Sequence, residues 1–417
     1  MPRADLKRSA AARLDEHLET FRVTAVTGAR QIGKSTLVAS LPGRTYVTLD
    51  DVGVLASASR DPVGFIAGLP PPVTIDEIQR VPELLLAIKQ RVDRDRTRGQ
   101  YVLTGSSRLD TLRGIRESLA GRTATLELGP LTWPERRGTP DASPVDTLFD
   151  LATVKEAVAA YAAIRDVRRV EGRDVLDGGF PEPVLELPAR ARTAWFREYI
   201  KTYIERDVPA IVHVADVPAF IRFVTACATT SASLLNTSEL ARDLGIAVDT
   251  VRRWIGVLET TFVAHRLTPF ARNIRTRLVK SPKLFLADTG LMAALLGITD
   301  WHDAVRRNLT GPLVETWFHQ QLHALCALAT DPVELSFFRT HGQVEVDFVL
   351  ERAGRLVPLE IKAGATVRPG DARGIEAFIE HFPRAATFGL VLHMGEALHP
   401  VTQHAAAVPL GTFLSAG

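Results

Sequence analysis

The sequence predicts an α/β fold, followed by a helical region and a second region that contains strands. Two apolar runs near the amino terminus, Val23–Val26 and Val73–Ile75, each lead directly into polar residues and indicate buried strands. Apolar residues at helical spacing in Pro82–Arg94 indicate a helix between such strands. After residue 305 the pattern changes to alternating strands, which predicts a separate carboxy-terminal domain.

The composition excludes several classes of protein. The 417 residues are 46% hydrophobic, which is enough for the cores of two or three domains. A net charge of +2 is too small to identify nucleic acid as a partner. No apolar run approaches the roughly 18 residues of a membrane span, and the first residues lack the apolar core of a signal peptide. We therefore expect a cytoplasmic protein with no membrane partner, in which Cys227 and Cys326 are buried thiols.

A glycine-rich motif follows the first predicted strand. It fits the pattern G-x-x-x-x-G-K-[ST] at every fixed position and consists of Gly28, Ala29, Arg30, Gln31, Ile32, Gly33, Lys34, Ser35 and Thr36. The glycines let the backbone wrap closely around a triphosphate, so that successive N–H groups point at its oxygens. Lys34 would reach the β- and γ-phosphates, and the Ser35 hydroxyl would hold Mg²⁺. The motif predicts a P-loop that binds ATP with Mg²⁺.

The second apolar run ends in two carboxylates, Asp76 and Glu77. This is the Walker B arrangement, in which Asp76 would hold Mg²⁺ through its water shell, opposite Ser35. Glu77 would polarise the attacking water as a general base. Plain surface charge is the alternative interpretation of this pair.

A further strand with a hydroxyl-rich tip, Tyr101–Ser107, is the predicted site of a sensor for the γ-phosphate. We assign Ser106 as the sensor and keep Thr104 as the second choice; a serine that caps the following helix is the alternative. Arg122 precedes the strand Thr123–Leu128, which we expect beside the sensor loop. It can stabilise transition-state charge as an arginine finger, in cis or from a neighbouring molecule, or it is an ordinary surface arginine.

These stretches resemble the AAA-type ATPases of bacteria and archaea that carry a carboxy-terminal domain of unknown function. The resemblance extends over nearly the whole chain, although residues 139–170 match poorly. Its motifs are residues 27–37, 74–81, the sensor strand, 118–122, 177–182, 203–208 and 281–290. The resemblance implies a parallel sheet in which the P-loop strand is central and the sensor strand lies between it and the Walker B strand.

The middle of the chain divides into two predicted modules. Residues 139–228 are mostly helical, and we interpret them as a lid that packs on the nucleotide site. Residues 229–304 contain a capped helix, a glycine turn and a second helix, Ala247–Leu258, in the recognition position of a helix-turn-helix. Phe262–Leu267 and Lys283–Leu286 would be the two strands of a wing, which together with the helices predicts a winged helix.

The segment between the two wing strands is rich in cations suited to phosphate contacts: Arg272, Arg275, Arg277, Lys280 and Lys283. DNA is therefore a predicted partner. A winged helix that packs against protein is the alternative.

The predicted carboxy-terminal domain begins at residue 305. Period two places Glu345 and Asp347 on one face of a strand, and Glu360 and Lys362 on one face of the next. Glu315 lies on a helix upstream. Of the 50 lysines and arginines in the chain only 8 are lysines, so a lysine kept inside a motif is informative.

This arrangement resembles the restriction-endonuclease-like nucleases, whose pattern is an acid followed by acid-x-Lys on the next strand. The resemblance implies that Asp347 and Glu360 bind Mg²⁺, with Glu315 as an added carboxylate. Lys362 would orient or activate water for attack on a phosphodiester. A salt-bridged strand pair that only stabilises the fold is the alternative, as is a domain that binds metal without cleaving.

The sequence thus predicts four domains: an ATPase core at 1–138, a lid at 139–228, a winged helix at 229–304 and a nuclease-like domain at 305–417. Two functions compete. One is an ATP-regulated nuclease, and the other is a nucleotide switch that binds DNA or a protein partner and cuts nothing. An oligomer is compatible with both.

Overall fold

The computed structural model describes residues 6–106, 119, 121–165, 167–208, 214, 216–271, 281–340 and 344–417. The side chains of residues 206 and 207 lie outside this description, as do the predicted phosphate-contacting cations Arg272, Arg275, Arg277 and Lys280. The chain forms two compact units. The first comprises residues 7–129 with 258–263, and the second comprises mainly residues 130–257 and 264–417.

The first unit is built on a five-stranded parallel sheet with the strand order β2-β3-β4-β1-β5. Its elements are α1 (Ala10–Thr20), β1 (Val23–Thr27), α2 (Lys34–Ala39), β2 (Thr45–Thr48), α3 (Val52–Arg60), α4 (Pro62–Ala67), β3 (Val73–Asp76), the 3₁₀ helix η2 (Ile78–Arg80), α5 (Leu84–Arg94), β4 (Tyr101–Gly105) and β5 (Thr123–Glu127). The predicted α/β class is confirmed. The sensor strand β4 lies between β1 and β3 as expected, but β4 rather than β1 is the middle strand.

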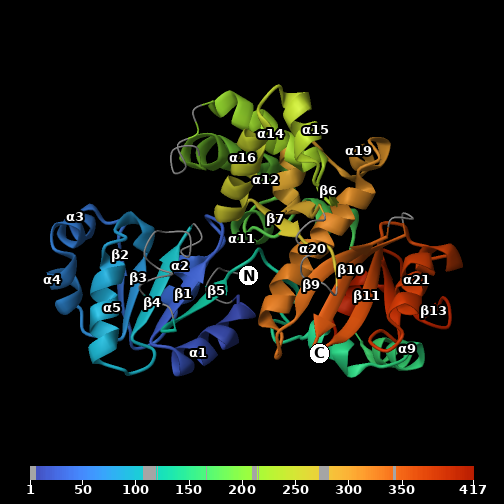
Figure 1. Cartoon of the computed structure of the whole chain (residues 1–417), viewed down its shortest axis with the longest axis horizontal. Helices are drawn as coiled ribbons and strands as arrows, with labels where there is room; N and C mark the ends of the chain where they lie inside the picture. The colour runs from blue at the N-terminus through green and yellow to red at the C-terminus, as the bar shows by residue number, and fades with distance from the viewer. Residues whose placement is uncertain are drawn as a thin grey trace. The chain divides into compact units, whose positions relative to one another are not determined.

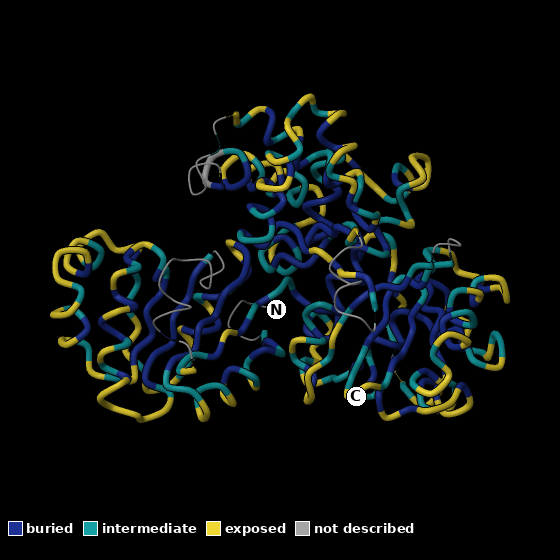
Figure 2. Tube along the Cα trace, viewed as in Figure 1, coloured by how far each residue is buried: buried dark blue, intermediate teal, exposed yellow. Residues whose placement is uncertain are grey.

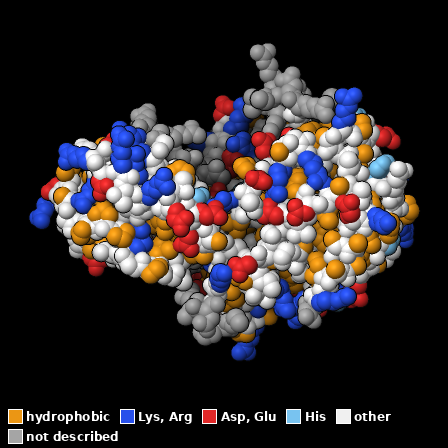
Figure 3. Space-filling view, turned by 90° about the horizontal axis from the view of Figure 1, so that it is seen from below, with side chains coloured by type: hydrophobic (Ala, Val, Ile, Leu, Met, Phe, Trp, Pro, Cys, Tyr) orange, Lys and Arg blue, Asp and Glu red, His pale blue; other side chains and the backbone are white. Residues whose placement is uncertain are grey.

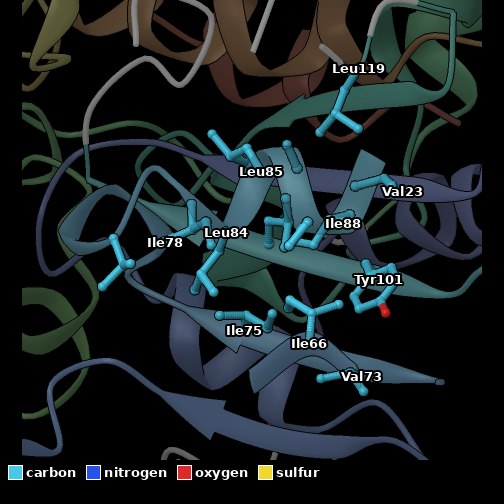
Figure 4. Close-up of a cluster of buried hydrophobic side chains, with 14 of the residues drawn as sticks. Val23, Ile66, Val73, Ile75, Ile78, Leu84, Leu85, Ile88, Tyr101 and Leu119 are labelled. Carbon is cyan, nitrogen blue, oxygen red and sulfur yellow. The ribbon is translucent and has the colours of Figure 1, made fainter. Parts of the chain in front are cut away.

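The core of the first unit forms where α3, α4 and α5 pack against β3 and β4. Figure 4 shows Leu84 of α5 near Ile75 and Ile88 near Tyr101, and these residues are buried together with Leu85 in one cluster. Figure 1 shows the same three helices grouped beside β2 and β3. The segment after β2 forms two helices, because Asp61 caps α4 and a proline follows it at the first helical position.

The second unit begins with helices and contains two sheets. Its helices are α7 (Trp133–Arg137), α8 (Pro144–Asp150), α9 (Val154–Ala163), α10 (Gly172–Leu176), α11 (Pro181–Leu185), α12 (Ala189–Tyr199), the π-helix η4 (Ile200–Asp207), α14 (Val217–Thr229), α15 (Thr237–Leu244), α16 (Val248–Thr260), α18 (Thr289–Leu295), α19 (Trp301–Arg306), α20 (Thr310–Leu328), the 3₁₀ helix η5 (Pro369–Ala372), α21 (Arg373–His381) and α22 (Leu410–Leu414). The last residues of α16 belong to the first unit.

Strands that precede and follow the helix-turn-helix of α15 and α16 in the sequence form a three-stranded sheet. It has the order β6-β8-β7, with all pairs antiparallel, and consists of β6 (Ser233–Leu234), β7 (Ala264–Leu267) and β8 (Lys283–Leu286). Gly245 ends α15 in the left-handed conformation, as a glycine turn requires. In α16, Val251 and Ile255 are buried while Arg252 and Arg253 are exposed, so the helix has an apolar inner face and a basic outer face.

The carboxy-terminal sheet is mixed and has the order β13-β14-β12-β11-β10-β9. Its strands are β9 (Glu334–Arg339), β10 (Glu345–Arg352), β11 (Arg355–Lys362), β12 (Gly389–His393), β13 (His399–Pro400) and β14 (Ala405–Pro409). β10 and β11 form the predicted antiparallel hairpin, and α21 connects β11 to its parallel neighbour β12. Figure 2 shows that these strands are largely buried, whereas exposed segments lie in helices and loops.

The predicted boundary between lid and carboxy-terminal domain is wrong for α8 and α9. α9 packs against β13 and β14, and α8 packs against α20. Asp146 of α8 forms an ion pair with Arg352, and the Arg355 guanidinium donates to the Phe149 carbonyl at 2.5 Å. Residues 144–163 therefore belong with the carboxy-terminal sheet, because their apolar faces are buried there.

The surface carries both signs of charge. On the face in Figure 3, lysine and arginine side chains are interspersed with aspartate and glutamate. Among the described helices, none combines the length and the apolar character that a membrane crossing requires. Cys227 is buried and Cys326 is partly buried, and both are free thiols in helices.

Candidate functional site

The P-loop connects the carboxyl end of β1 to the start of α2. Gly28 and Gly33 have φ angles of 147° and 94°, which favour glycine. A side-chain carbon at Gly28 would lie 2.3 Å from the Leu128 carbonyl oxygen, so the loop approaches the backbone after β5 too closely for any other residue. The predicted strand–loop–helix arrangement is therefore present.

Lys34 is the first residue of α2, and its side chain is buried. Its ammonium donates to the carbonyl oxygens of Gly28 and Ala29 at 3.0 and 2.8 Å, so it lies inside the loop. Burial lowers the pKa of Lys34 to about 8, although the nearby carboxylates of Glu77 and Asp76 oppose this shift. An ammonium desolvated in this way interacts strongly with an anion that enters the loop.

Ser35 and Asp76 lie close together at the end of the sheet where the parallel strands have their carboxyl ends. The Ser35 hydroxyl donates to Asp76 Oδ1 at 3.1 Å. Two further hydroxyls point at the same carboxylate: Tyr46 donates to Oδ2 at 2.7 Å, and Thr104 donates to Oδ1. Burial, followed by the Asp76 hydrogen bond, raises the pKa of Tyr46. Hydroxyl and carboxylate oxygens are the ligands that Mg²⁺ prefers, so this donor set fits the expected metal.

Glu77 follows β3 in the left-handed conformation, with a φ of 59°. Its backbone N–H donates to Thr104 Oγ1 at 3.1 Å. The Gln79 amide donates to the Glu77 carboxylate and also to Ser106 Oγ, at 3.2 Å in the second case. A left-handed glutamate is uncommon and costs conformational energy, which the surrounding hydrogen bonds offset. The structure thus brings Lys34, Ser35, Asp76 and Glu77 together with both sensor candidates.

Arg122 lies away from this site. It immediately precedes β5, whose first residue is in register with Val23 at the amino end of β1, and its guanidinium pairs with Asp93. The P-loop follows the opposite end of β1, five residues further along a parallel strand with a rise of about 3.3 Å per residue. The expectation that Arg122 lies beside the sensor loop is therefore wrong, and an arginine finger in cis does not fit. Only a role in trans remains as a prediction.

The predicted metal ligands of the carboxy-terminal domain also converge. β10 and β11 are in register at Phe348 and Leu359, which places Asp347 beside Glu360. The Ile361 N–H donates to Asp347 Oδ2 at 2.8 Å, and the Lys362 ammonium donates to Glu360 Oε1 at 2.9 Å. The pairing of β10 with β9 shifts by one residue between Val346 and Val349, so Asp347 lies at a β-bulge. Bulges occur next to functional sites, where they redirect side chains.

Lys283 joins this group unexpectedly. It is the first residue of β8 and is only 2% exposed. Its ammonium contacts Glu315 Oε1 at 2.8 Å, Glu345 Oε1 at 2.6 Å and Asp347 Oδ1 at 3.7 Å. The expectation that Lys283 presents its charge to phosphate is therefore wrong, because the charge is buried among carboxylates.

Electrostatics distinguish this group from surface ion pairs. Burial raises the pKa of Glu315 and of Glu360 to about 8 in each case, and the charge of Asp347 contributes to both shifts. Burial likewise raises the pKa of Asp347. Burial alone would lower the pKa of Lys283, but Glu315, Asp347 and Glu345 raise it. Shifts of this kind, produced by desolvation and specific partners, are concentrated at functional sites.

Comparison with known proteins agrees with this geometry. The AAA domain family matches residues 20–136. Two domains of unknown function, DUF8612 and DUF4143, match residues 173–302 and 310–413. Uncharacterized protein Rv2008c of Mycobacterium tuberculosis and uncharacterized protein Mb2031c of Mycobacterium bovis are each 31% identical to this chain over 416 residues, covering 99% of this chain and 85% of the relative. The chain belongs to the family of these two proteins.

The AAA match supports a P-loop AAA-type domain that binds nucleotide in the first unit. The Walker-type ATPase PABY2304 of Pyrococcus abyssi is similar in structure, with a TM-score of 0.42 and 16% identity, over 70% of this chain and 99% of that chain. Similarity at that level carries no argument about function.

Sequence reasoning gave no role to three residues of the two sites and assigned a fourth, Lys283, to phosphate contacts. Tyr46 and Gln79 contact the Walker B acids, and Lys283 and Glu345 complete the carboxy-terminal group. A signal for Lys283 was available, because it is one of 8 lysines and lies in a family-like motif. For Tyr46 and Gln79 the signal is weaker, since it depends on knowing which strands are neighbours.

Proposed function

We propose that the first unit hydrolyses ATP with Mg²⁺. The observation that supports this most strongly is the 3.1 Å contact between Ser35 Oγ and Asp76 Oδ1 at the edge of the sheet where Lys34 is buried in the P-loop. A hydroxyl, a carboxylate and a desolvated ammonium converge there from two non-adjacent strands. No structural purpose requires that combination at a glycine-rich loop.

Each side chain has a defined task in this proposal. Lys34 would leave the carbonyl oxygens of its own loop and donate to the β- and γ-phosphates of ATP. Ser35 and Asp76 would hold Mg²⁺, which supplies charge neutralisation at the phosphates. Glu77 would accept a proton from, or orient, the water that attacks the γ-phosphate. Thr104 holds both Asp76 and the Glu77 backbone, so it is the residue best placed to relay the state of the γ-phosphate.

The direct test is steady-state release of phosphate from ATP, with Mg²⁺ and with excess EDTA. We expect turnover to require the metal. Ser35→Ala should reduce turnover at fixed Mg²⁺ by about 10-fold or more, because one charge-assisted contact is lost. Ser40→Ala is the matched control, since Ser40 is exposed and its hydroxyl donates to the Leu37 carbonyl of its own helix at 2.7 Å. Equal turnover in EDTA, or an unchanged Ser35→Ala variant, would contradict the proposed site.

A second function is proposed for the carboxy-terminal sheet, on the strength of the bulge at Asp347 and its neighbours on β11. Asp347 and Glu360 would bind Mg²⁺, and Lys362 would orient water for attack on a phosphodiester. The pair α15 and α16, with β7 and β8, would bind the nucleic acid as a winged helix. The competing proposal is a nucleotide-dependent switch that cleaves nothing, and the buried Lys283 favours it.

Incubation of the full chain with DNA and with RNA, in Mg²⁺ and in Mn²⁺, separates these two proposals. A nuclease should cleave at least one substrate, and Lys362→Ala should abolish that cleavage without affecting ATP turnover. Lys155→Ala is the control, because it removes an exposed lysine of the same unit. Absence of cleavage by the wild-type chain over a broad set of substrates would support the switch.

A further inference from the structure

The carboxylates of Glu315, Glu345, Asp347 and Glu360 form a group that we call the acid cluster. We propose that the Lys283 ammonium occupies the position of a divalent metal ion within the acid cluster. It blocks metal binding there until a movement of β8 removes the ammonium. The inference rests on the proposed metal-binding role of Asp347 and Glu360, and it adds how access to that site is controlled.

The first argument is the geometry of the ammonium. The 2.8 Å contact to Glu315 is a charge-assisted hydrogen bond, Glu345 forms an ion pair with the ammonium at 2.6 Å, and Asp347 lies 3.7 Å away. Three carboxylates around one buried ammonium resemble the ligand shell of a cation. A metal ion held by Asp347, Glu360 and Glu315, with oxygen ligands at about 2.1–2.5 Å, would need the Asp347 and Glu315 carboxylates that the ammonium contacts. The ammonium and the metal ion therefore compete for one place.

The second argument is the charge of the whole group. Among the described residues, these four carboxylates face the ammonium groups of Lys283 and Lys362, and Arg339 lies 3.5 Å from Glu345 Oε2. The Glu360 Oε2 atom is buried and has no hydrogen-bond partner in the described part of the chain. A buried carboxylate oxygen without a partner is costly. The acid cluster thus has ligand capacity that its own lysines do not satisfy.

The third argument is where Lys283 comes from. The acids are on α20, β10 and β11, whereas Lys283 is on β8, in the three-stranded sheet. There it pairs with Leu267 of β7 and with Leu234 of β6, which directly precedes the helix-turn-helix. A ligand that displaces this sheet would move Lys283 relative to the acids. The contact therefore couples the helix-turn-helix segment to the metal site.

The test is Mn²⁺ binding to the full, nucleotide-free chain, measured by calorimetry and by electron paramagnetic resonance of free Mn²⁺. Lys283→Gln should bind one Mn²⁺ ion at the acid cluster. Its affinity for that ion should be at least about tenfold higher than that of the same site in the wild type. Adding Asp347→Asn to that variant should remove the gained site. Because the P-loop is identical in all these proteins, its contribution cancels, and ATP turnover reports separately on the first unit.

Two further variants complete the design. Lys155→Gln removes one exposed positive charge from the same unit and should leave Mn²⁺ binding unchanged. If Lys283→Gln does not fold without metal, the paired variant Lys283→Met with Glu315→Gln removes one cation and one anion together, and it should still bind Mn²⁺ more tightly than wild type. A wild-type chain that binds Mn²⁺ through Asp347 as tightly as the Lys283 variants would overturn the proposal.

Discussion

Lys34→Ala is expected to reduce the affinity for ATP by about 10- to 100-fold, because it removes a charge-assisted contact with the phosphates. The structure gives a specific reason for this magnitude. The Lys34 side chain is already buried inside the loop, where the Gly28 and Ala29 carbonyl oxygens accept from its ammonium until phosphate oxygens replace them. Equilibrium binding of a fluorescent ATP analogue, with ATP as competitor, measures the change.

The matched control is Lys89→Ala, which removes a lysine from α5 in the same unit. Thermal unfolding of both variants shows whether the fold is retained. A Lys34→Ala chain that folds normally and binds ATP as wild type does would refute the assignment of the P-loop site. If the Lys34 ammonium contacts the β- and γ-phosphates, its removal must weaken ATP binding.

The lowered pKa of Lys34 predicts that ATP affinity depends on pH. Since burial lowers the pKa of Lys34 to about 8, the free chain loses this positive charge as the pH rises through that value. Phosphate favours the charged form, so binding takes up a proton above pH 8. ATP affinity of the wild type should therefore decline from pH 7 to pH 9, and the decline should be smaller in Lys34→Ala.

The nucleotide site could be predicted from the sequence because its residues are local. Gly28, Gly33, Lys34 and Ser35 lie within one loop, and Asp76 terminates one apolar strand. Fixed spacing and a flanking strand are enough to define such a site. Contacts between strands are different, because they depend on the order of strands in the sheet. Thr104 contacts Asp76 because β4 lies beside β3. Arg122 was misplaced because it precedes the amino end of β5, whereas the nucleotide site lies at the carboxyl ends of the strands.

The carboxy-terminal site shows a second limit of sequence reasoning. Period-two alternation correctly placed Asp347, Glu360 and Lys362 on facing positions, but it cannot show a cation that arrives from another sheet. Lys283 is 64 residues from Asp347 in the chain, and its strand pairs with β6 and β7. It was assigned to phosphate contacts because its neighbours in sequence are basic. The burial of Lys283, which rules out a contact with phosphate, is a property of the tertiary structure.

The largest effect on chemistry is expected from Glu77→Gln, which should reduce ATP turnover by about 10²- to 10⁴-fold while the chain still binds ATP. Glutamine keeps the size of the side chain and its place beside Gln79, but it cannot accept a proton from water. The backbone contact of Glu77 with Thr104 does not involve the carboxylate, and a glutamine oxygen can still accept from the Gln79 amide. The expected result is therefore a loss of kcat with little change in ATP affinity.

Single-turnover release of phosphate from pre-bound ATP distinguishes this loss of chemistry from a loss of binding. Glu83→Gln is the control, because Glu83 is an exposed carboxylate just before α5. Gln79→Ala adds a finer comparison: if Gln79 only orients Glu77, its removal should lower kcat less than Glu77→Gln does. Normal turnover by Glu77→Gln would transfer the role of general base to another group, and Asp76, held by three hydroxyls, is too fully hydrogen-bonded to take it.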